Sequence, residues 1–491
     1  MLYNTKVYNL NSCKRAFLFG GIILEFINEK LVEFNQYLKN RKVAIIGLGV
    51  SNIPLLDYMH EKQASVTVFD NRNIDAIPKD LIDKITSYAM EFSFGENSLS
   101  KLKNFDIIFR SPSCLPTTPE LMLEEQRGAI VTSEIEMLME MAPCPIIGVT
   151  GSEGKTTTTS LIYAILKEAG YTCHLGGNIG TPLFTKLSEF LPEDILILEL
   201  SSFQLMNMKV SPNISVITNI TPNHLNIHHS YEEYIEAKKT IFKYQGEQGT
   251  LILNYDNEIT KECAKEAPGK VVFFSSRNRL DDGYIVDGEI IKECEDRLRK
   301  HILNVKEIKL RGKHNYENIC AALAATKTFV DPEKAVHTIQ EFNSVEHRIE
   351  FVREINGVKW YNDSASSSPS RTIAGLQAFD EDIILIAGGY DKNLDYKPIA
   401  KPIVDKVKIL ILMGNTAPKI FDVVKEELEA EQKELPIYMC DEFRQTIAIA
   451  HKFAKPGQIV LFSPASASFD MFKDFADRGR KFKTIVNSIE E

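Results

Sequence analysis

Glycines, a lysine and threonines lie close together at residues 151–157, which read Gly-Ser-Glu-Gly-Lys-Thr-Thr. An apolar strand is expected just before them at 146–150, and a helix just after them. Glycines let backbone amides approach a phosphate, and a helix N-terminus adds positive potential. Lys155 can bridge the β- and γ-phosphates of a nucleotide, and Thr156 can ligate Mg²⁺. The strict phosphate-loop pattern needs glycine where Val149 stands, so the cluster predicts a phosphate site that departs from the generic form.

A carboxylate, an imidazole and an amine follow this loop in the sequence. Glu199 lies near the end of an apolar strand expected at 195–200, and a carboxylate at the end of a central strand is well placed to hold Mg²⁺. His224 comes after a strand expected at 215–219, and Lys238 lies on a later helix. Taken singly, such a histidine would more often be structural and such a lysine solvent-exposed. Their occurrence together, after a phosphate loop, favours one shared site.

A second glycine pattern, Gly47-x-Gly49-x-x-Asn52, lies nearer the N-terminus. It follows a strand expected at 42–46 and precedes a helical stretch and a second strand, which ends at Asp70. This arrangement predicts a β-turn-α-β unit of Rossmann type. Asparagine replaces the third glycine of the usual dinucleotide pattern, so the motif by itself leaves a nicotinamide site and a nucleotide-sugar site equally open.

The elements that must position these residues alternate between strands and helices. Pro143 and Pro145 interrupt regular structure and indicate a domain boundary. Further strands are expected at 65–69, 105–109, 251–254, 359–362, 383–387, 409–413 and 459–463, and a helix at 315–329. The pattern predicts an α/β chain of three domains. These are a Rossmann-like domain at 41–142, a central P-loop-type ATPase domain at 143–343 and a Rossmann-like domain at 344–491, after an N-terminal extension and lead-in helix at 1–40.

Composition and charge narrow the class of protein. The 491 residues carry a formal net charge of −10, which argues against nucleic acid as the main partner because phosphate backbones require basic surface. The eight cysteines are scattered without metal-ligand spacing and are expected to be reduced thiols of a cytoplasmic protein. An apolar run at 16–27, broken by Glu25, is too short to span a bilayer. We expect it to belong to a disordered or non-native extension.

Six motifs in order resemble the Mur ligases, from about Lys42 to near the C-terminus. They are 149–157, Gly177-Asn-Ile-Gly180, Glu199-Leu-Ser-Ser-Phe-Gln204, Asn223-His-Leu225 with Ala237-Lys238, Gly312-Lys-His-Asn315 with Asn318, and His347-Arg348. Within that family the chain is most similar to the D-glutamate-adding branch, on 198–205, Tyr361-Asn-Asp-Ser364, 463–470 with Phe475, and Gly47-Leu-Gly49. The resemblance implies a cytoplasmic, ATP-dependent ligase of peptidoglycan precursor synthesis. Such an enzyme adds D-glutamate to UDP-N-acetylmuramoyl-L-alanine through an acyl phosphate.

The resemblance also implies roles for individual residues. Lys155, Glu199, His224 and Lys238 would be catalytic. Thr156 and Glu199 would hold one Mg²⁺, and His224 a second with Lys238 as its carbamate. ATP would contact Gly151, Gly154, Lys155, Thr156, Thr157, Asn318, Arg348 and Asp363. The UDP substrate would contact Ser51, Asp70, Arg72 and Asn178, and D-glutamate would contact Lys392, Ser468 and Phe475.

Three positions depart from the family pattern. Asn226 stands where aspartate often follows His-Leu, Ala365 where many members have lysine, and Ser113 where glycine is usual. None of these changes removes a residue expected to bind ATP or metal. Activity is therefore expected to be retained, and the effect on substrate affinity stays open.

Other assignments remain open at this point. A sibling ligase could add L-alanine or a diamino acid, although the Asp-Asn-Pro-Arg motif expected of a diamino-acid enzyme does not occur in the sequence. Folylpolyglutamate synthetase is disfavoured by the additional Rossmann-like first domain. A nucleotide-binding regulator without catalysis is disfavoured because Lys155, Glu199, His224 and Lys238 are all present.

Overall fold

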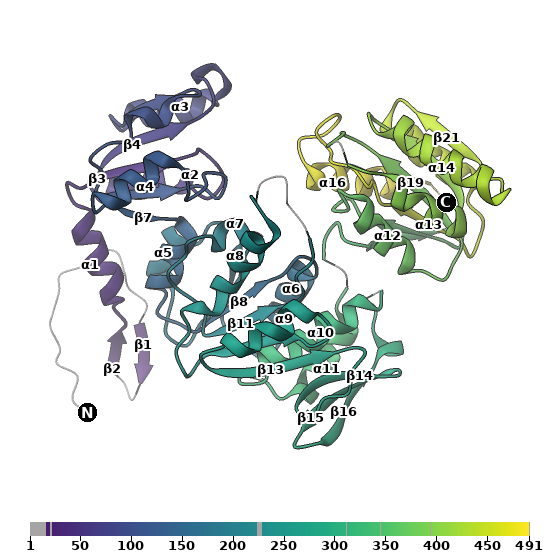
Figure 1. Ribbon diagram of the computed structural model, residues 1–491, viewed down its shortest axis with the longest axis horizontal. Coiled ribbons are helices and arrows are strands. Elements are labelled where there is room, and N and C mark those ends of the chain that lie inside the picture. Colours follow the sequence, from purple (N-terminus) through teal and green to yellow (C-terminus); the bar gives the residue numbers. More distant parts are fainter. Residues whose placement is uncertain are drawn as a thin grey trace. The chain divides into compact units, whose positions relative to one another are not determined.

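The computed structural model describes residues 16–19, 22–222, 228–310, 312–343, 345–392 and 394–490, with side chains from residue 26 onward. These residues form two compact units. One consists of residues up to 302 together with 317–335, and the other of 303–316 together with 336 onward. Figure 1 labels the helices and strands.

The first sheet has five parallel strands in the order β5-β4-β3-β6-β7. They are β3 (Lys42–Ile46), β4 (Ser65–Asp70), β5 (Glu91–Phe94), β6 (Ile107–Arg110) and β7 (Ile130–Thr132), with helices α2 (Ile53–Glu61), α3 (Lys79–Ser87), α4 (Pro119–Gln126) and α5 (Glu134–Met141). The predicted β-turn-α-β unit is confirmed. Because the strand order reverses at β3, the carboxyl ends of β3, β4 and β6 meet at the edge where such sheets bind ligands.

The N-terminal segment differs from the expectation of a disordered extension. Strand β1 (Ala16–Phe19) pairs antiparallel with β2 (Ile22–Glu25), and helix α1 (Glu29–Leu38) follows. In the sequence, two glycines separate two short apolar runs, which is a composition typical of a hairpin. Helix α1 buries Leu31, Phe34 and Leu38, so the lead-in helix belongs to the first folded unit.

The middle sheet has nine strands in the order β16-β15-β14-β13-β12-β11-β8-β10-β9. They are β8 (Ile146–Thr150), β9 (Cys173–Gly177), β10 (Ile195–Glu199), β11 (Ile214–Ile217), β12 (Thr250–Asn254), β13 (Lys270–Ser275), β14 (Gly283–Asp287), β15 (Ile290–Glu295) and β16 (Leu298–Asn304). The strands predicted near 146–150, 195–200, 215–219 and 251–254 are confirmed and lie at the centre of the sheet. The outer strands, where β15 runs antiparallel to β14, were not predicted from the sequence.

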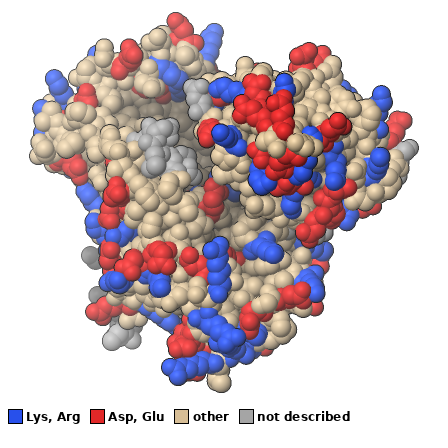
Figure 2. Space-filling view, turned by 45° about the vertical axis from the view of Figure 1, so that its right-hand side comes forward, with Lys and Arg blue, Asp and Glu red and all other residues tan. Residues whose placement is uncertain are grey.

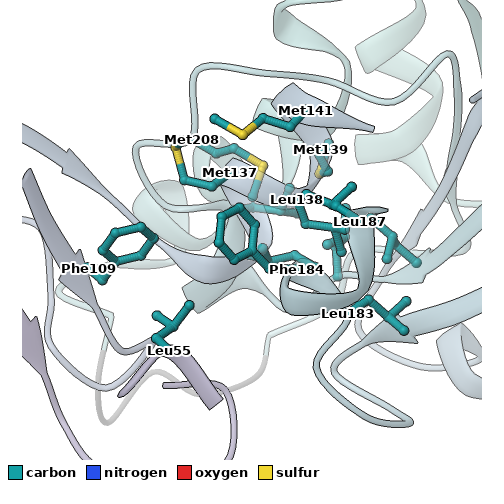
Figure 3. Packing of buried hydrophobic residues seen from close by; sticks show 14 of the residues in the cluster. Leu55, Phe109, Met137, Leu138, Met139, Met141, Leu183, Phe184, Leu187 and Met208 are labelled. Carbon is teal, nitrogen blue, oxygen red and sulfur yellow. The ribbon is translucent and has the colours of Figure 1, made fainter. Parts of the chain in front are cut away.

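The helices of this part of the chain are α6 (Lys155–Glu168), α7 (Ser202–Leu205), α8 (Tyr231–Lys243), α9 (Glu258–Cys263), α10 (His314–Thr326) and α11 (Pro332–Glu341). One apolar cluster joins it to the first sheet. Figure 3 shows Phe184 of the middle region beside Phe109 of β6, with Leu55 of α2 and Met137 of α5 nearby. The rings of Phe109 and Phe184 have centroids 6.2 Å apart. This shared core explains why the first and middle sheets form one compact unit.

The second unit contains a six-stranded sheet in the order β17-β18-β22-β19-β20-β21. Its strands are β17 (Glu350–Ile355), β18 (Val358–Asn362), β19 (Ile383–Gly388), β20 (Val407–Met413), β21 (Ile437–Cys440) and β22 (Ile459–Phe462), parallel except for β17. Helices α12 (Pro369–Gln377), α13 (Lys397–Lys406) and α14 (Ala417–Glu431) contribute to one core cluster, and α15 (Phe443–Phe453) and α16 (Phe475–Asn487) to another. Helices thus cover both faces, as predicted for an open α/β sheet.

The surface carries charges of both signs. On the face drawn in Figure 2, acidic and basic side chains are interspersed rather than gathered into separate areas. Among the described residues no helix is long and apolar enough to cross a bilayer. The seven cysteines of the described part of the chain are free thiols.

Candidate active site

The phosphate loop joins β8 to α6 through two glycines whose backbone excludes other residues. Gly151 has a φ of +149°, and an added Cβ would lie 1.9 Å from Thr218 Oγ1. Gly154 has a φ of +83°, and an added Cβ would lie 2.4 Å from Asn318 Oδ1. Both conformations suit glycine alone. Asn318, which is predicted to contact ATP, therefore lies directly against the loop.

Two lysines donate to the same carbonyl of this loop. Lys155 Nζ donates to Gly151 O at 2.8 Å and to Ser152 O at 2.9 Å. Lys238 Nζ donates to Gly151 O at 2.8 Å and to Thr150 Oγ1 at 3.4 Å. The structure thus brings together two predicted catalytic residues that are 83 positions apart in the chain.

Burial changes the acid–base chemistry of Lys238. Its side chain is almost fully buried, and this burial lowers its pKa well below the usual 10.5. The positive charge of Lys155 lowers it further, whereas Glu153 and Glu199 act in the opposite direction. The Lys238 amine also lies 4.7 Å from the centre of the Tyr234 ring. Burial and the Lys155 charge dominate over Glu153 and Glu199 and increase the fraction of the neutral, nucleophilic amine, whereas the ring contact favours the cation.

The helical period of α8 explains why Lys238 rather than Lys239 enters the site. Tyr234, Ala237 and Ile241 are buried and lie on the same stripe as Lys238. The next residue, Lys239, lies outside this site, and its amine forms ion pairs with Glu236 at 2.8 Å and Glu266 at 2.7 Å. The two neighbouring lysines therefore face different surroundings.

Glu199 supplies a buried carboxylate at the end of β10. Its Oε1 accepts a hydrogen bond from Asn178 Nδ2 at 2.8 Å, and its backbone carbonyl accepts one from the Asn178 amide at 2.8 Å. Its Oε2 is buried and has no hydrogen-bond partner among the described residues. A buried carboxylate oxygen needs a donor or a cation, so Glu199 fits a divalent metal ion such as Mg²⁺. Asn178 orients this carboxylate, and its contact with the UDP substrate stays a prediction.

Thr156, Thr157 and His224 are the other residues predicted for this region. Thr156 and Thr157 are buried in the first turn of α6. His224 lies outside the described residues, as does the departure at Asn226. The second metal position predicted for His224 therefore stays a prediction.

The first sheet places the residues predicted for the UDP substrate around the Gly47 turn. Asp70, at the end of β4, accepts the Leu48 amide at 2.8 Å and pairs with Arg72 Nη2 at 2.8 Å. Burial raises the pKa of Asp70, but the hydrogen bonds from Arg72 and Leu48 outweigh it and hold that pKa below 3.8. Asp70 thus braces the turn, and the partly exposed Arg72 presents positive charge beside it. Ser51 lies half-buried in the turn before α2.

In the second unit, Asp363 follows β18 and is enclosed by hydroxyl groups. Its Oδ2 accepts from Ser366 Oγ and Ser463 Oγ, both at 2.6 Å, and its Oδ1 accepts from the Ile349 amide at 3.2 Å. Burial raises the pKa of Asp363 to about 6 against the effect of these hydrogen bonds and of Arg348. Arg348 precedes Ile349 directly, so the structure gathers the predicted ATP residues of this unit at the end of β18.

The residues predicted for D-glutamate lie at the same carboxyl edge of this sheet. Lys392 follows β19, and its amine is 6.0 Å from the centre of the Phe469 ring. Ser468 is buried in the segment after β22. Phe475 begins α16 with an exposed ring, and its carbonyl accepts from Ser364 Oγ at 2.7 Å. The three residues come from different segments that the parallel sheet brings to one edge.

Arg478 of α16 was not predicted from the sequence, and its guanidinium is fully buried beside these segments. One signal could have found it. Arg478, Phe482 and Val486 recur at the helical spacing of four, and all three are buried. A cation on the apolar stripe of a helix is unusual and marks a position with special partners.

Three family models match successive parts of the chain. They are the Mur ligase MurD-like N-terminal domain at residues 41–133, the Mur ligase middle domain at 149–326, and the Mur ligase glutamate ligase domain at 347–466. The order of the three agrees with the sheets described above. The chain belongs to the Mur ligase family.

Curated relatives match nearly the whole chain. The UDP-N-acetylmuramoylalanine–D-glutamate ligase of Acetivibrio thermocellus is 47% identical over 94% of this chain and 100% of its own. The relatives of the same name in Ruminiclostridium cellulolyticum and Clostridium tetani are 46% and 45% identical, each over 94% of this chain and 100% of the relative.

Solved structures share the fold at low sequence identity. The UDP-N-acetylmuramate-alanine ligase MurC from Thermotoga maritima superposes with a TM-score of 0.57 at 16% identity, covering 91% of this chain and 100% of that one. A pseudomurein peptide ligase type C from Methanothermus fervidus gives 0.55 at 20% identity, covering 92% and 100%. The three-domain α/β fold predicted from the sequence is thus confirmed.

Proposed function

We propose that the protein joins D-glutamate to UDP-N-acetylmuramoyl-L-alanine, with ATP hydrolysis, in the cytoplasmic synthesis of peptidoglycan precursors. The choice of amino acid is supported by the name shared by relatives that are 45–47% identical over nearly the whole chain. The proposed chemistry is supported above all by one observation, that the amines of Lys155 and Lys238 both donate a hydrogen bond to the carbonyl of Gly151. Glu199 lies on the neighbouring strand, in register with Val149 just before that loop.

A carboxylate is a poor electrophile, and transfer of a phosphoryl group from ATP converts it to an acyl phosphate. The loop amides, Lys155 and Thr157 would hold the phosphates, and Thr156 and Glu199 would hold Mg²⁺. When bound, the metal neutralises negative charge on the transferring group. Lys155 would act on the same charge from the protein side, since its amine already lies within reach of the loop.

Lys238 has the properties required for carbamylation. Its neutral amine can add CO₂ and release a proton to form a carbamate, whose single negative charge is shared by two oxygens. The lowered pKa of Lys238 increases the fraction of the reactive neutral amine. A carbamate there would supply anionic ligands beside Glu199, whose Oε2 has no hydrogen-bond partner in the described part of the chain. An unmodified ammonium would repel the metal instead.

The remaining predicted residues would bind and orient the three reactants. Ser51, Asp70, Arg72 and Asn178 would serve the UDP substrate, and Asn318, Arg348 and Asp363 the nucleotide. D-glutamate has two carboxylates, for which the Lys392 amine and the Ser468 hydroxyl are suitable partners. Its amine would attack the acyl phosphate, form the amide bond and release phosphate.

The test is phosphate release by the purified full-length protein with ATP, Mg²⁺ and UDP-N-acetylmuramoyl-L-alanine. D-glutamate should trigger release, with L-glutamate, L-alanine and diaminopimelate near background. Lys155→Ala should lose the D-glutamate-dependent signal. A comparable rate with L-alanine or a diamino acid would reassign the protein to a sibling ligase, and no release with any amino acid would support a regulator without catalysis.

A further inference from the structure

Arg478 has no exposed surface, although arginine is among the residue types that are rarely buried. Its helix α16 begins at Phe475, which is predicted to contact D-glutamate. Burying a guanidinium is costly unless every N–H group finds an acceptor. The hydrogen-bond acceptors around the guanidinium therefore explain why Arg478 can be buried.

The guanidinium of Arg478 donates five hydrogen bonds to two loops. Its Nε donates to Ser364 Oγ at 3.0 Å and its Nη2 to Ser364 O at 2.8 Å, in the loop after β18. Its Nη1 donates to Ala467 O at 2.8 Å and Ser466 O at 3.1 Å, and its Nη2 also to Ser466 O at 3.1 Å, in the segment after β22. The five hydrogen bonds go to four uncharged oxygens, since Ser466 O accepts two of them, so the contact is a clamp between two loops rather than an ion pair.

Each clamped segment carries residues predicted to bind reactants. Ser364 stands next to Asp363, and its hydroxyl also donates to the Phe475 carbonyl at 2.7 Å. Ala467 stands next to Ser468. The third segment, which leads to Lys392, passes close by, since a Cβ added to Gly389 would lie 2.3 Å from Ala467 O and 3.1 Å from Arg478 Nη1.

Fold stability alone does not require an arginine at this position. Replacing buried charged groups by apolar side chains of similar volume is often neutral or stabilising. A planar fork with five donors is, however, suited to fix two loops at a set separation. Lysine has three donors on one atom and can reach fewer of these acceptors.

We propose that Arg478 is a positioning residue of the amino-acid site, which holds the segments of Ser468 and Phe475 in the geometry that receives D-glutamate. This inference rests on the proposed function. A misplacement of about 1 Å at a reacting group can reduce the rate about a hundredfold. Loosening the clamp should therefore act on D-glutamate first, because the UDP substrate is predicted to bind the first sheet.

The experiment compares Arg478→Lys and Arg478→Ala with a control of matched stability. Phe482→Leu is the control, since Phe482 is fully buried one turn further along α16 and stacks on Phe462 with ring centroids 4.7 Å apart. Melting temperatures and the KM values for D-glutamate and UDP-N-acetylmuramoyl-L-alanine are measured with kcat for each protein. Guanidinium chloride at low millimolar concentration is then added to Arg478→Ala and to the control.

We expect kcat/KM for D-glutamate to fall about a hundredfold in Arg478→Ala and less in Arg478→Lys, with the KM for the UDP substrate within about twofold of wild type. Added guanidinium should restore part of the loss in Arg478→Ala and none in Phe482→Leu. If Arg478→Ala does not fold, Arg478→Lys decides. Unchanged D-glutamate kinetics in Arg478→Lys, or the same loss in Phe482→Leu at equal melting temperature, would overturn the proposal. A wild-type protein that does not use D-glutamate would instead overturn the proposed function.

Discussion

Replacing Lys238 with methionine should separate catalysis from stability. Methionine retains most of the volume of the buried stem and removes the amine. The two lost hydrogen bonds, to Gly151 O and Thr150 Oγ1, contribute roughly 0.5–1.5 kcal/mol each. Gly151 O keeps Lys155 Nζ as a donor at 2.8 Å, so no buried carbonyl loses its last partner. Removing the cost of burying the amine offsets the loss, so the free energy of unfolding should stay within about 2 kcal/mol of wild type.

Activity should respond in a different way. If the Lys238 carbamate supplies anionic oxygens to the site, Lys238→Met should reduce D-glutamate-dependent phosphate release by about 10²–10³-fold, as loss of a single stabilising group does in related chemistry. Lys238→Ala should lose a similar factor and recover part of it with added formate or acetate, which can occupy the vacated space. Lys239→Met is the matched control, because its amine pairs with Glu236 and Glu266 outside the site.

The pH dependence of stability provides an independent check. Burial lowers the pKa of Lys238 below 10.5, so below that pH the unfolded chain binds a proton that the folded chain binds less readily. The wild-type lysine therefore costs stability, and this cost decreases as pH rises toward 10.5. In urea denaturation in CO₂-free buffer, the stability of Lys238→Met relative to wild type should fall as pH rises. Activity of Lys238→Met within fivefold of wild type, or an equal loss in Lys239→Met, would refute the reasoning.

Three further predictions follow from other parts of the molecule. Lys155→Ala should reduce phosphate release by a few hundredfold, about 3–4 kcal/mol, and a variant within fivefold of wild type would show that the loop is not catalytic. Burial raises the pKa of Asp363 from 3.8 to about 6. The folded state therefore retains a proton between these pH values, and wild-type stability should fall as pH rises through this window. In urea denaturation, Asp363→Asn should flatten this dependence of stability on pH. Deleting residues 1–24 should leave activity and melting temperature unchanged, because α1 with Leu31 and Phe34 remains, and aggregation of the shortened protein would show that the segment belongs to the fold.

Much of the site could be predicted from the sequence because its parts are local. The strand, glycine loop and helix at 146–168 follow one another directly, and the pattern of residue types encodes all three. The separation of Lys238 from Lys239 follows from the helical period of α8, which needs no knowledge of what packs against the helix. The central parallel strands were predictable because they are nearly continuous apolar runs.

Other features of the molecule were harder to predict from local patterns in the sequence. Strands β13–β16 mix buried positions with partly or fully exposed ones and lie at the outer part of the middle sheet, where apolar runs are weaker. The hairpin of β1 and β2 was missed because its apolar run was interpreted as one segment, although the two glycines that divide the run are typical of a hairpin. The partner of Asn178 could not be predicted either, because the sequence does not state that β9 lies next to β10.

The sequence by itself determined which residues could do chemistry and on which kind of element each lies, since residue type and periodicity are properties of short segments. Only the tertiary structure decided their partners. Asn178 meets Glu199, Lys238 meets Gly151, and Arg478 clamps Ser364 to Ser466 across more than a hundred positions of the chain. These contacts depend on the order in which strands pair, and that order is set by the packing of the whole domain rather than by any local pattern.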